Sequence, residues 1–420
     1  MSRPDTFGTP YRVLKGRTRT SGTVYGVDRW LLRTFLHVMG DPTIRAALWD
    51  GKDVAGPFPE AAVRMTIRDR RALWRLVTNP LLNFGDDYSA GRIEIEGGLV
   101  AFMKAIYGAM GRGSRRFPQS AYHRKQTDTN SPAGSRGNIH HHYDIGNDFY
   151  QLWLDREMLY TCAYFPHPGA SLEEAQIAKM DLVCRKLRLR AGQSVVEAGC
   201  GWGALARYMA RHYGVSVRAY NISREQIAYA REMAVAEGIV GQVEYVEDDY
   251  RTITGRFDAF VSVGMLEHVG PDHYRELGRI IDRSLTDEGL GLIHTIGQNV
   301  AEPMSPWLVK RIFPGSYPPT LREMMAVFEP WGLSVLDVEN LRLHYAKTLE
   351  HWLERFENNR ERVAAMFDDC FVRAWRLYLS AAIANFTLGR LQLFQVVFAR
   401  SANNLIPWTR SHLSDTRASG

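Results

Sequence analysis

The segment from Val195 to Gly203 carries residue types that suit a nucleotide-type cofactor. Val195 and Val196 begin a short β-branched run that predicts a buried strand, and Glu197 places an acid near its end. Three glycines then follow at alternate positions. Glycines there let the backbone turn tightly and approach a ligand that a Cβ would exclude, although a purely structural turn can show the same pattern. The segment therefore predicts a cofactor site without saying which cofactor.

A dinucleotide site is disfavoured by the strand that follows. Dinucleotide-binding folds show G-x-G-x-x-G and, about 20 residues later, an acid that holds a ribose. Here the glycines are spaced G-x-G-x-G, and the comparable stretch, residues 219–223, reads Ala-Tyr-Asn-Ile-Ser. NAD is therefore a poor fit, because the ribose acid is missing.

Short Val- and Ile-rich runs alternate with longer helical patterns from Ser194 onward. This alternation is typical of β-α units in a doubly wound, mostly parallel sheet. We predict strands at 194–198, 216–220, 242–247, 257–263 and 289–295, with helices at 204–212, 224–237 and 273–284. After Trp307 the pattern is mainly helical and rich in aromatic residues. Ligands bind outside the carboxyl ends of such strands, which is where the glycine turn lies.

The remaining sequence predicts a second, smaller domain. A chain of 420 residues exceeds one average domain. Residues 108–138 are polar and rich in Gly, Ser and Arg, without periodicity, and such a stretch is unusual inside a compact domain. We expect an N-terminal accessory, lipid-docking domain over residues 1–110, a linker over 111–137, a catalytic domain over 138–410 and a tail over 411–420.

Composition limits the partners and the location. The formal net charge is +6, which suits nucleic acid or an anionic bilayer surface, or merely keeps the protein soluble. The cysteines at 162, 184, 200 and 370 form no C-x-x-C pair, and no run approaches the about 18 apolar residues of a membrane span. We expect a cytoplasmic protein that contacts a membrane only peripherally.

Five motifs in one order carry a family resemblance. Residues 142–149 are similar to the motif H-Y-D-x-G-N-D, and residues 160–165 are similar to Y-S-C-A-Y-F. The glycine turn at 199–203, the stretch Gly-Met-Leu-Glu-His-Val-Gly at 264–270 and His-Thr-Ile-Gly at 294–297 follow. Over residues 138–408 the chain resembles the cyclopropane-fatty-acyl-phospholipid synthases and the related mycolic acid methyltransferases.

The resemblance implies an α/β fold of the Rossmann-like class I methyltransferase type, with a doubly wound, mostly parallel sheet. It also implies a smaller N-terminal accessory domain and helical additions that form an acyl pocket. Residues 79–96 look like the accessory domain of the full-length bacterial enzymes, which the mycolic acid enzymes lack. That difference favours phospholipid acyl chains as substrate.

The cofactor implied by the resemblance is S-adenosyl-L-methionine. Its contacts would fall on the glycine turn and on neighbouring strand ends, at Tyr160, Thr161, Glu197, Gly199, Cys200, Gly201, Gly203, Asn221, Ile222, Gln226, Asp249 and Tyr250. The chain departs from the family pattern at two places. Glu197 stands where many members have Asp, and residues 219–221 replace a more usual Gly-Val-Thr, which alters the contact with the ribose edge.

The family's chemistry also implies a second small ligand. An isolated alkene is a feeble nucleophile toward a sulfonium methyl and needs close approach in a dry pocket. Ring closure then requires a base, which the resemblance gives as bicarbonate held by Cys162, Glu267, His294, a main-chain group at Ile296, and Tyr345. A glutamate beside an anion implies a raised Glu267 pKa or a shared proton.

Each of these residues also has a plain structural explanation. Cys162 can be a small buried hydrophobe, and Glu267 can cap the helix after the fourth strand. His294 lies in an apolar strand where a core histidine is common, and Tyr345 can simply pack. The three histidines at 140–142 do not predict a metal site, because adjacent residues on an extended chain point to alternate faces.

The sequence therefore predicts an enzyme that methylates the double bond of an unsaturated phospholipid acyl chain and closes a cyclopropane ring. The alternative is a fatty-acyl C-methyltransferase that leaves a methyl or methylene branch. A nucleic-acid-binding methyltransferase and a catalytically silent lipid-binding protein are less favoured, the former because no nucleic-acid module is present. We expect the partner to be unsaturated phospholipid in the anionic inner face of the membrane, and we expect no binding to nucleic acid. We also expect a homodimer.

Overall fold

The computed structural model describes residues 22–112 and 145–413. The chain separates into two compact units that are not continuous along the sequence. The first contains residues 1–125, 303–314 and 349–389, and the second contains residues 126–302, 315–348 and 390–420. This division differs from the predicted one, because two segments of the expected catalytic domain group with the N-terminal elements. Most of the predicted linker, residues 113–137, lies outside the described residues, and so do residues 140–144.

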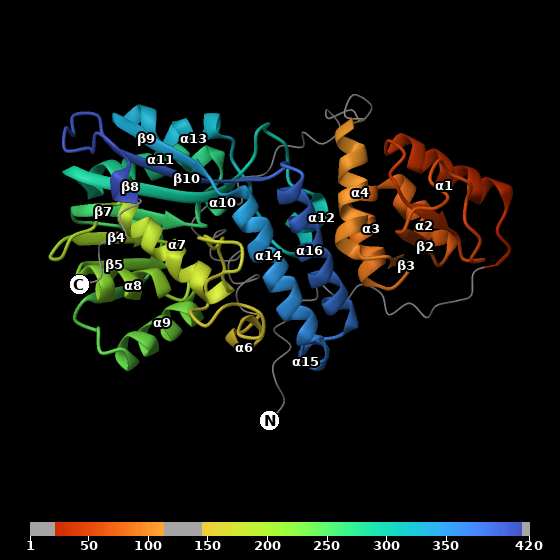
Figure 1. The fold of residues 1–420 in the computed structure, drawn as a ribbon, viewed down its shortest axis with the longest axis horizontal. Coiled ribbons are helices and arrows are strands. Elements are labelled where there is room, and N and C mark those ends of the chain that lie inside the picture. Colours follow the sequence, from red (N-terminus) through yellow and green to blue (C-terminus); the bar gives the residue numbers. More distant parts are fainter. Residues whose placement is uncertain (1–21, 113–144, 414–420) are drawn as a thin grey trace. The chain divides into compact units, whose positions relative to one another are not determined.

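The second unit is built on a seven-stranded sheet with the order β6-β5-β4-β7-β8-β10-β9 (Figure 1). The five strands from β6 to β8 pair in parallel, and β10 pairs antiparallel with both β8 and β9. The strands are β4 (Ser194–Ala198), β5 (Ser216–Asn221), β6 (Val243–Glu247), β7 (Phe257–Val263), β8 (Leu285–Gly297), β9 (Leu333–Asn340) and β10 (Gln392–Arg400). The five predicted strands and the doubly wound sheet are confirmed.

The chain after Trp307 is mainly helical, as predicted, but it also supplies two strands, β9 and β10, that the sequence analysis did not predict. Strand β10 lies between β8 and β9, and its residues are buried except for the last. A strand covered on both faces has an unbroken apolar run, and periodicity cannot distinguish such a run from a buried helix. Its place in the sheet is therefore set by long-range pairing.

Helices cover both faces of this sheet. One face packs against α7 (Leu172–Lys186), α8 (Ala204–Tyr213) and α9 (Arg224–Ala236) in a core that includes Val183, Leu205 and Ile227. The other face packs against α11 (Tyr274–Ser284) and α13 (Leu321–Phe328) through Leu277, Ile281 and other apolar residues. The short helices α6 (Asn147–Tyr150) and α10 (Leu266–Val269) also belong to this unit. The predicted helices are confirmed with small shifts at their ends.

The first unit combines a small sheet with helices from distant parts of the chain. Its strands β1 (Arg45–Ala47), β2 (Arg64–Ile67) and β3 (Ile93–Glu96) pair in that order. Its helices are α1 (Gly26–Val38), α2 (Arg70–Thr78), α3 (Pro80–Ser89), α4 (Leu99–Arg112), α12 (Pro306–Arg311), α15 (Arg360–Met366) and α16 (Asp369–Thr387). Helix α14 (Arg342–Asn358) has its first residues in the second unit and the remainder in the first.

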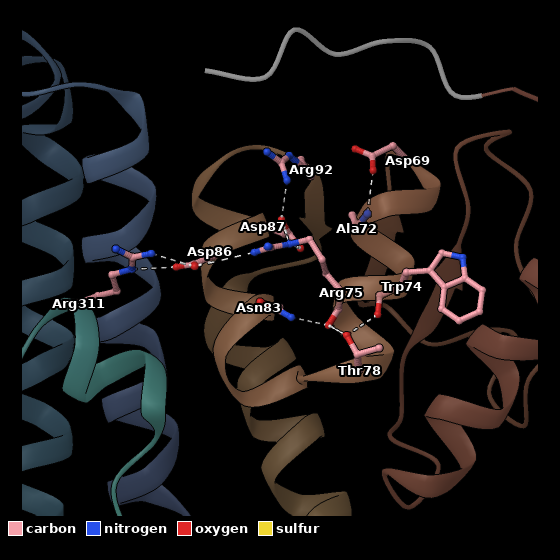
Figure 2. Close-up of polar contacts among 10 residues, drawn as sticks. All are labelled: Asp69, Ala72, Trp74, Arg75, Thr78, Asn83, Asp86, Asp87, Arg92 and Arg311. Carbon is pink, nitrogen blue, oxygen red and sulfur yellow. Dashed lines mark hydrogen bonds and ion pairs between the residues drawn. The ribbon is translucent and has the colours of Figure 1, made fainter. Parts of the chain in front are cut away.

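A buried ion network explains why α12 groups with the N-terminal helices (Figure 2). The carboxylate of Asp86 on α3 accepts two hydrogen bonds of 3.0 Å from the Arg311 guanidinium on α12. The neighbouring Asp87 is fully buried and accepts hydrogen bonds from Arg75 on α2, the shorter at 2.9 Å, and from Arg92 at 3.1 Å. Two adjacent carboxylates thus connect three guanidinium groups that are far apart in the sequence.

In the described part of the chain, no helix is both long and apolar enough to cross a bilayer.

Candidate active site

The glycine turn has a backbone that favours glycine at all three alternate positions. The φ angles are +84° at Gly199, +54° at Gly201 and +79° at Gly203, in the left-handed region that L side chains rarely adopt. The main-chain amides of Gly199 and Cys200 both donate to the Tyr220 carbonyl, at 2.9 and 3.0 Å. A Cβ added at Gly201 would meet no atom within 4 Å, so the turn faces open space. This open space beside a rigid turn suits a bound cofactor.

Two predicted cofactor contacts connect the turn to the next strand end. Asn221 donates from Nδ2 to the Gly201 carbonyl at 3.2 Å and to Gln226 Oε1 at 2.7 Å. Helix α9 begins here because the Ser223 hydroxyl caps its first turn, which also fixes Gln226. Ile222 lies between these residues in the same connection. The turn, Asn221 and Gln226 thus form one pre-organised edge.

Two predicted cofactor contacts, Asp249 and Tyr250, follow β6 and differ in their hydrogen bonding. The Asp249 carboxylate already accepts hydrogen bonds from the Arg251 main chain and guanidinium, both at 2.9 Å. The Tyr250 hydroxyl is buried and has no hydrogen-bond partner among the described residues. Tyr250 therefore offers an unused polar group, whereas the Asp249 carboxylate is partly occupied.

The side chain of Glu197, a predicted cofactor contact, is almost completely buried. It is 2 % exposed near the end of β4, and one carboxylate oxygen has no hydrogen-bond partner among the described residues. Burial raises its pKa to about 8, although Lys179 and Arg207 oppose that rise.

Thr161 is held by two residues of α7 that the sequence analysis missed. Lys179 donates from Nζ to the Thr161 hydroxyl at 2.9 Å, and Gln176 donates to the Thr161 carbonyl at 2.9 Å. Both α7 side chains are fully buried, and burial lowers the pKa of Lys179 to about 8. Polar residues at positions 176 and 179, in line with the apolar positions 172, 175, 180 and 183, were the signal that could have found them.

An aromatic cluster covers this side of the turn. The Tyr160 ring lies 5.5 Å from that of Tyr150 and 5.2 Å from that of Trp153, between ring centres. Tyr150 also contacts Trp202 of the glycine turn, at 5.0 Å. Large apolar rings at these positions exclude water from the neighbourhood of the turn.

Glu267 and Ile296 are brought into direct contact. The main-chain N–H of Ile296 donates to Glu267 Oε1 at 2.6 Å, so the predicted main-chain donor at Ile296 orients the carboxyl group. The other oxygen, Oε2, is buried without a hydrogen-bond partner among the described residues. Burial raises the pKa of Glu267 to about 7, and the Ile296 hydrogen bond opposes this rise. A group in this state can donate a proton as well as accept one.

His294 lies two residues before Ile296 on β8 and is 1 % exposed. Its Nδ1 atom is 3.0 Å from Nε2 of Gln395, and its Nε2 atom has no hydrogen-bond partner among the described residues. Burial holds the His294 pKa well below its usual range, and Lys179 and Lys186 act in the same direction. The ring is therefore neutral at physiological pH.

Cys162 and the main chain of Tyr345 both contact the Leu341 carbonyl at the start of α14. The Cys162 thiol lies 3.9 Å from the Leu341 carbonyl, which also accepts the main-chain N–H of Tyr345 at 3.1 Å. The main chain of Ala163 donates to Thr348 Oγ1 at 3.0 Å, so the segment runs along the start of α14. Burial raises the pKa of the Cys162 thiol above the range where it ionises, which makes it inert as a nucleophile.

The structure thus joins the predicted catalytic residues in two groups, Glu267 with Ile296 and His294 on β8, and Cys162 with Tyr345 beside α14. The charge of Lys179 acts on a residue of each group, because it lowers the pKa of both Cys162 and His294.

A family model described as mycolic acid cyclopropane synthetase matches residues 131–396. The chain belongs to this family. A second model, described as a domain of unknown function, matches residues 31–113. The predicted resemblance and the predicted enzyme class, an S-adenosylmethionine-dependent C-methyltransferase, are confirmed.

The chain is similar to two curated relatives and to one solved structure that illustrate the family. A probable fatty acid methyltransferase of Pseudomonas putida is 35 % identical over 88 % of this chain and 96 % of its own. The cyclopropane-fatty-acyl-phospholipid synthase of Escherichia coli K12 is 41 % identical over 63 % of this chain and 68 % of its own. The crystal structure of mycolic acid cyclopropane synthase CmaA1 complexed with SAH and CTAB is 29 % identical, with a TM-score of 0.60, over 63 % and 97 % of the two chains.

The family member therefore uses S-adenosylmethionine to modify lipid acyl chains. The predicted fold class, a Rossmann-like methyltransferase fold, is confirmed as well. The open space at Gly201, the Asn221–Gln226 edge and the unpartnered Tyr250 hydroxyl fit the cofactor at the glycine turn.

Replacing Gly203 by Ala is expected to weaken S-adenosylmethionine binding by about tenfold or more, as measured by titration calorimetry. A Cβ at Gly203 would lie 2.6 Å from the Tyr245 hydroxyl, which donates to the Gly203 carbonyl, so the turn has to move. The matched control is Gly238→Ala, at a φ of +71° with open space around it. Equal cofactor affinity of both variants and the parent would contradict the assignment of the turn.

Proposed function

We propose that this enzyme transfers the methyl group of S-adenosylmethionine to the double bond of an unsaturated phospholipid acyl chain and closes a cyclopropane ring. Ring closure requires a proton to leave the newly added methyl group. Bound bicarbonate would supply the base for that step, and Cys162, Glu267, His294, Ile296 and Tyr345 are the residues that would hold it.

The observation that carries this proposal is a pair of unused polar atoms on two neighbouring elements. Glu267 Oε2 and His294 Nε2 are both buried and lack a hydrogen-bond partner among the described residues. A buried polar group without a partner costs about 1–3 kcal/mol, so two of them beside one strand support the proposal that a polar ligand binds here. A small oxyanion with one proton matches a neutral imidazole and a carboxyl group whose pKa is about 7.

The chain's own residues give this site its chemical character. Ile296 orients the Glu267 carboxyl group through its main-chain N–H. The aromatic cluster of Tyr150, Trp153, Tyr160 and Trp202 keeps water away from the glycine turn, where the methyl group is transferred. A dry site protects a carbocation on the acyl chain from capture by water.

A second candidate function is methyl or methylene branching without ring closure. A relative that matches 88 % of the chain is described as a probable fatty acid methyltransferase, whereas the cyclopropane-fatty-acyl-phospholipid synthase of Escherichia coli matches 63 % of the chain. Both reactions begin with the same methyl transfer and end with the loss of a proton. They differ in whether the carbocation closes a ring as the proton leaves or ends as a new double bond.

The test is incubation of the full chain with methyl-labelled S-adenosylmethionine and liposomes of monounsaturated phospholipid. Released fatty acids are analysed by mass spectrometry, and NMR locates the added carbon, because a ring and a methylene branch have the same mass. Cyclopropane protons in the product support ring closure. A vinylidene signal, or a methyl branch beside a retained double bond, supports the second function, and no labelled acyl chain overturns both.

We also propose that the first unit docks on anionic lipid. Trp30 on α1 and Trp74 on α2 are 59 % and 50 % exposed, and Arg33 and Arg71 on the same helices are exposed. Indole rings are common at membrane interfaces, and exposed arginines are attracted to anionic headgroups.

Binding to vesicles that contain anionic phospholipid is expected to be strong at low salt and to fall as ionic strength rises, because salt screens exposed charges. Co-sedimentation measures the bound fraction. The double variant Trp30→Ser with Trp74→Ser is expected to bind several-fold more weakly, while Trp408→Ser, at another fully exposed tryptophan, binds like the parent. Equal binding to neutral and anionic vesicles at low salt would count against this proposal.

A further inference from the structure

His294 lies in a row of polar side chains that crosses three strands. In the sheet register Gln395 on β10 is opposite His294 on β8 on one side and opposite Glu339 on β9 on the other. Lys186, in the last turn of α7, reaches the same row and donates to Gln395 Oε1 at 2.7 Å and to Glu339 Oε2 at 2.5 Å. These strands lie in the order β8, β10, β9 at one side of the sheet (Figure 1).

The direction of each hydrogen bond in this row follows from the chemistry of Lys186. An ammonium group only donates, so the Gln395 oxygen must face Lys186 and its amide nitrogen must face His294. An amide nitrogen only donates as well. The Nδ1 atom of His294, at 3.0 Å, must therefore accept, and it carries no proton.

We infer that Lys186 and Gln395 are positioning residues that hold His294 in the tautomer with its proton on Nε2. The inference rests on the proposed role of His294 in holding an oxygen ligand. In this tautomer Nε2 is a hydrogen-bond donor toward the site, and neither ring nitrogen is free to act as a base.

Burial supports the same assignment. Gln395 is fully buried, His294 is 1 % exposed and Lys186 is 3 % exposed, so water does not compete for these hydrogen bonds. The lowered pKa of His294 keeps the ring neutral, and one neutral ring has one N–H. The unpartnered Nε2 is then a donor that a ligand oxygen satisfies.

The consequence for the reaction is specific. If His294 cannot take a proton at Nδ1 and already carries one at Nε2, the proton lost during ring closure must go to another base. The hydrogen bonds from Lys186 through Gln395 to His294 thus explain why the site needs a base other than His294 to accept this proton.

The tautomer is measured by NMR on the full chain labelled with ¹⁵N-histidine, with His294→Gln identifying the signal among the 13 histidines. From about pH 6 to about pH 8 the parent is expected to show a neutral ring protonated at Nε2. In Gln395→Glu the introduced carboxylate needs a donor, so the Nδ1 atom becomes protonated. A parent ring protonated at Nδ1, or an unchanged tautomer in Gln395→Glu, overturns the inference.

A second variant covers the case in which Gln395→Glu does not fold. Lys186→Met removes the ammonium group that fixes the amide, and the structure then allows the Gln395 side chain to flip. Signals of both His294 tautomers are expected in this variant. A single Nε2-protonated ring in Lys186→Met shows that the lysine does not position Gln395 and overturns its part in the inference.

Kinetics distinguish positioning from general support of the fold. Gln395→Glu is expected to reduce kcat by about tenfold or more while the Kd for S-adenosylmethionine stays within about twofold. Gln193→Glu, the same substitution in the loop before β4, is the control and keeps the parent's kcat. If the parent modifies no acyl chain, the proposed function fails, while the NMR result still decides the inference.

Discussion

Replacing Glu267 by Gln is expected to reduce kcat by about 100-fold or more while the Kd for S-adenosylmethionine stays within about twofold. The amide keeps an oxygen for the Ile296 N–H, so the local geometry is preserved. The amide has an NH2 group in place of the second carboxyl oxygen, Oε2, so it carries no titratable proton there. In the parent, Oε2 has no hydrogen-bond partner among the described residues. The measurement is turnover on monounsaturated liposomes together with calorimetric titration of the cofactor.

The same substitution is expected to leave stability unchanged or higher at alkaline pH. The Glu267 pKa in the folded state is about 7, above the ordinary value of 4.5, so the folded state binds this proton more tightly than the unfolded state. The resulting stability is fully present below 4.5 and is lost as pH rises through about 7. Above that range the charged side chain costs on the order of 3 kcal/mol, which a neutral amide partly avoids.

The stability signature is a Tm difference that depends on pH. Glu267→Gln should unfold at a higher temperature relative to the parent near pH 8 than near pH 5. Glu244→Gln is the matched control, because Glu244 is exposed on β6 and pairs only with Arg218 among the described residues. Normal turnover in Glu267→Gln would remove Glu267 from the catalytic site. A loss of turnover together with a lower Tm at both pH values would indicate a purely structural role.

Replacing Asp87 by Asn is expected to destabilise the first unit by about 3–5 kcal/mol. Asp87 is fully buried between the guanidinium groups of Arg75 and Arg92, and Arg92 is itself buried. Burial raises the pKa of Asp87, and Arg75 and Arg92 oppose this rise because they favour the charged carboxylate. An amide leaves Arg92 without this carboxylate and leaves Arg75 with only the longer contact to Asp86, at 3.9 Å, which Asp86 shares with Arg311 (Figure 2).

Differential scanning calorimetry of the full chain is the measurement, and the first thermal transition should fall by about 10 °C. Asp53→Asn is the control, because Asp53 pairs with Arg64 at the surface and such pairs contribute about 1 kcal/mol or less. A transition that moves equally little in both variants would show that the buried network does not stabilise the unit.

The parallel part of the sheet could be predicted because its signals are local. Strands β4 and β7 have the predicted bounds, 194–198 and 257–263, and the glycine turn after β4 has the positive φ angles that its spacing implies. The family motifs likewise identified Glu267, Ile296 and His294 as neighbours in function. The structure adds that Ile296 acts on Glu267 directly.

The division into units could not be predicted from local patterns. Arg311 is 225 residues from Asp86, yet the two form a bidentate ion pair inside the first unit. Helix α16 also belongs to this unit, where Arg373 donates to the Tyr88 carbonyl across 285 residues. Contacts between residues so far apart in the sequence leave no periodic signal. Within their own segments, Arg311 and Arg373 look like ordinary surface arginines.

By itself, the sequence determined the glycine turn and the class of reaction, and it predicted the residues beside the reacting groups, since each depends on residue types a few positions apart. Only the tertiary structure decided the state of His294. Gln395 lies 101 residues from His294 and 209 residues from Lys186. They meet because β10 inserts antiparallel between β8 and β9, and that pairing places an amide where it fixes the imidazole proton.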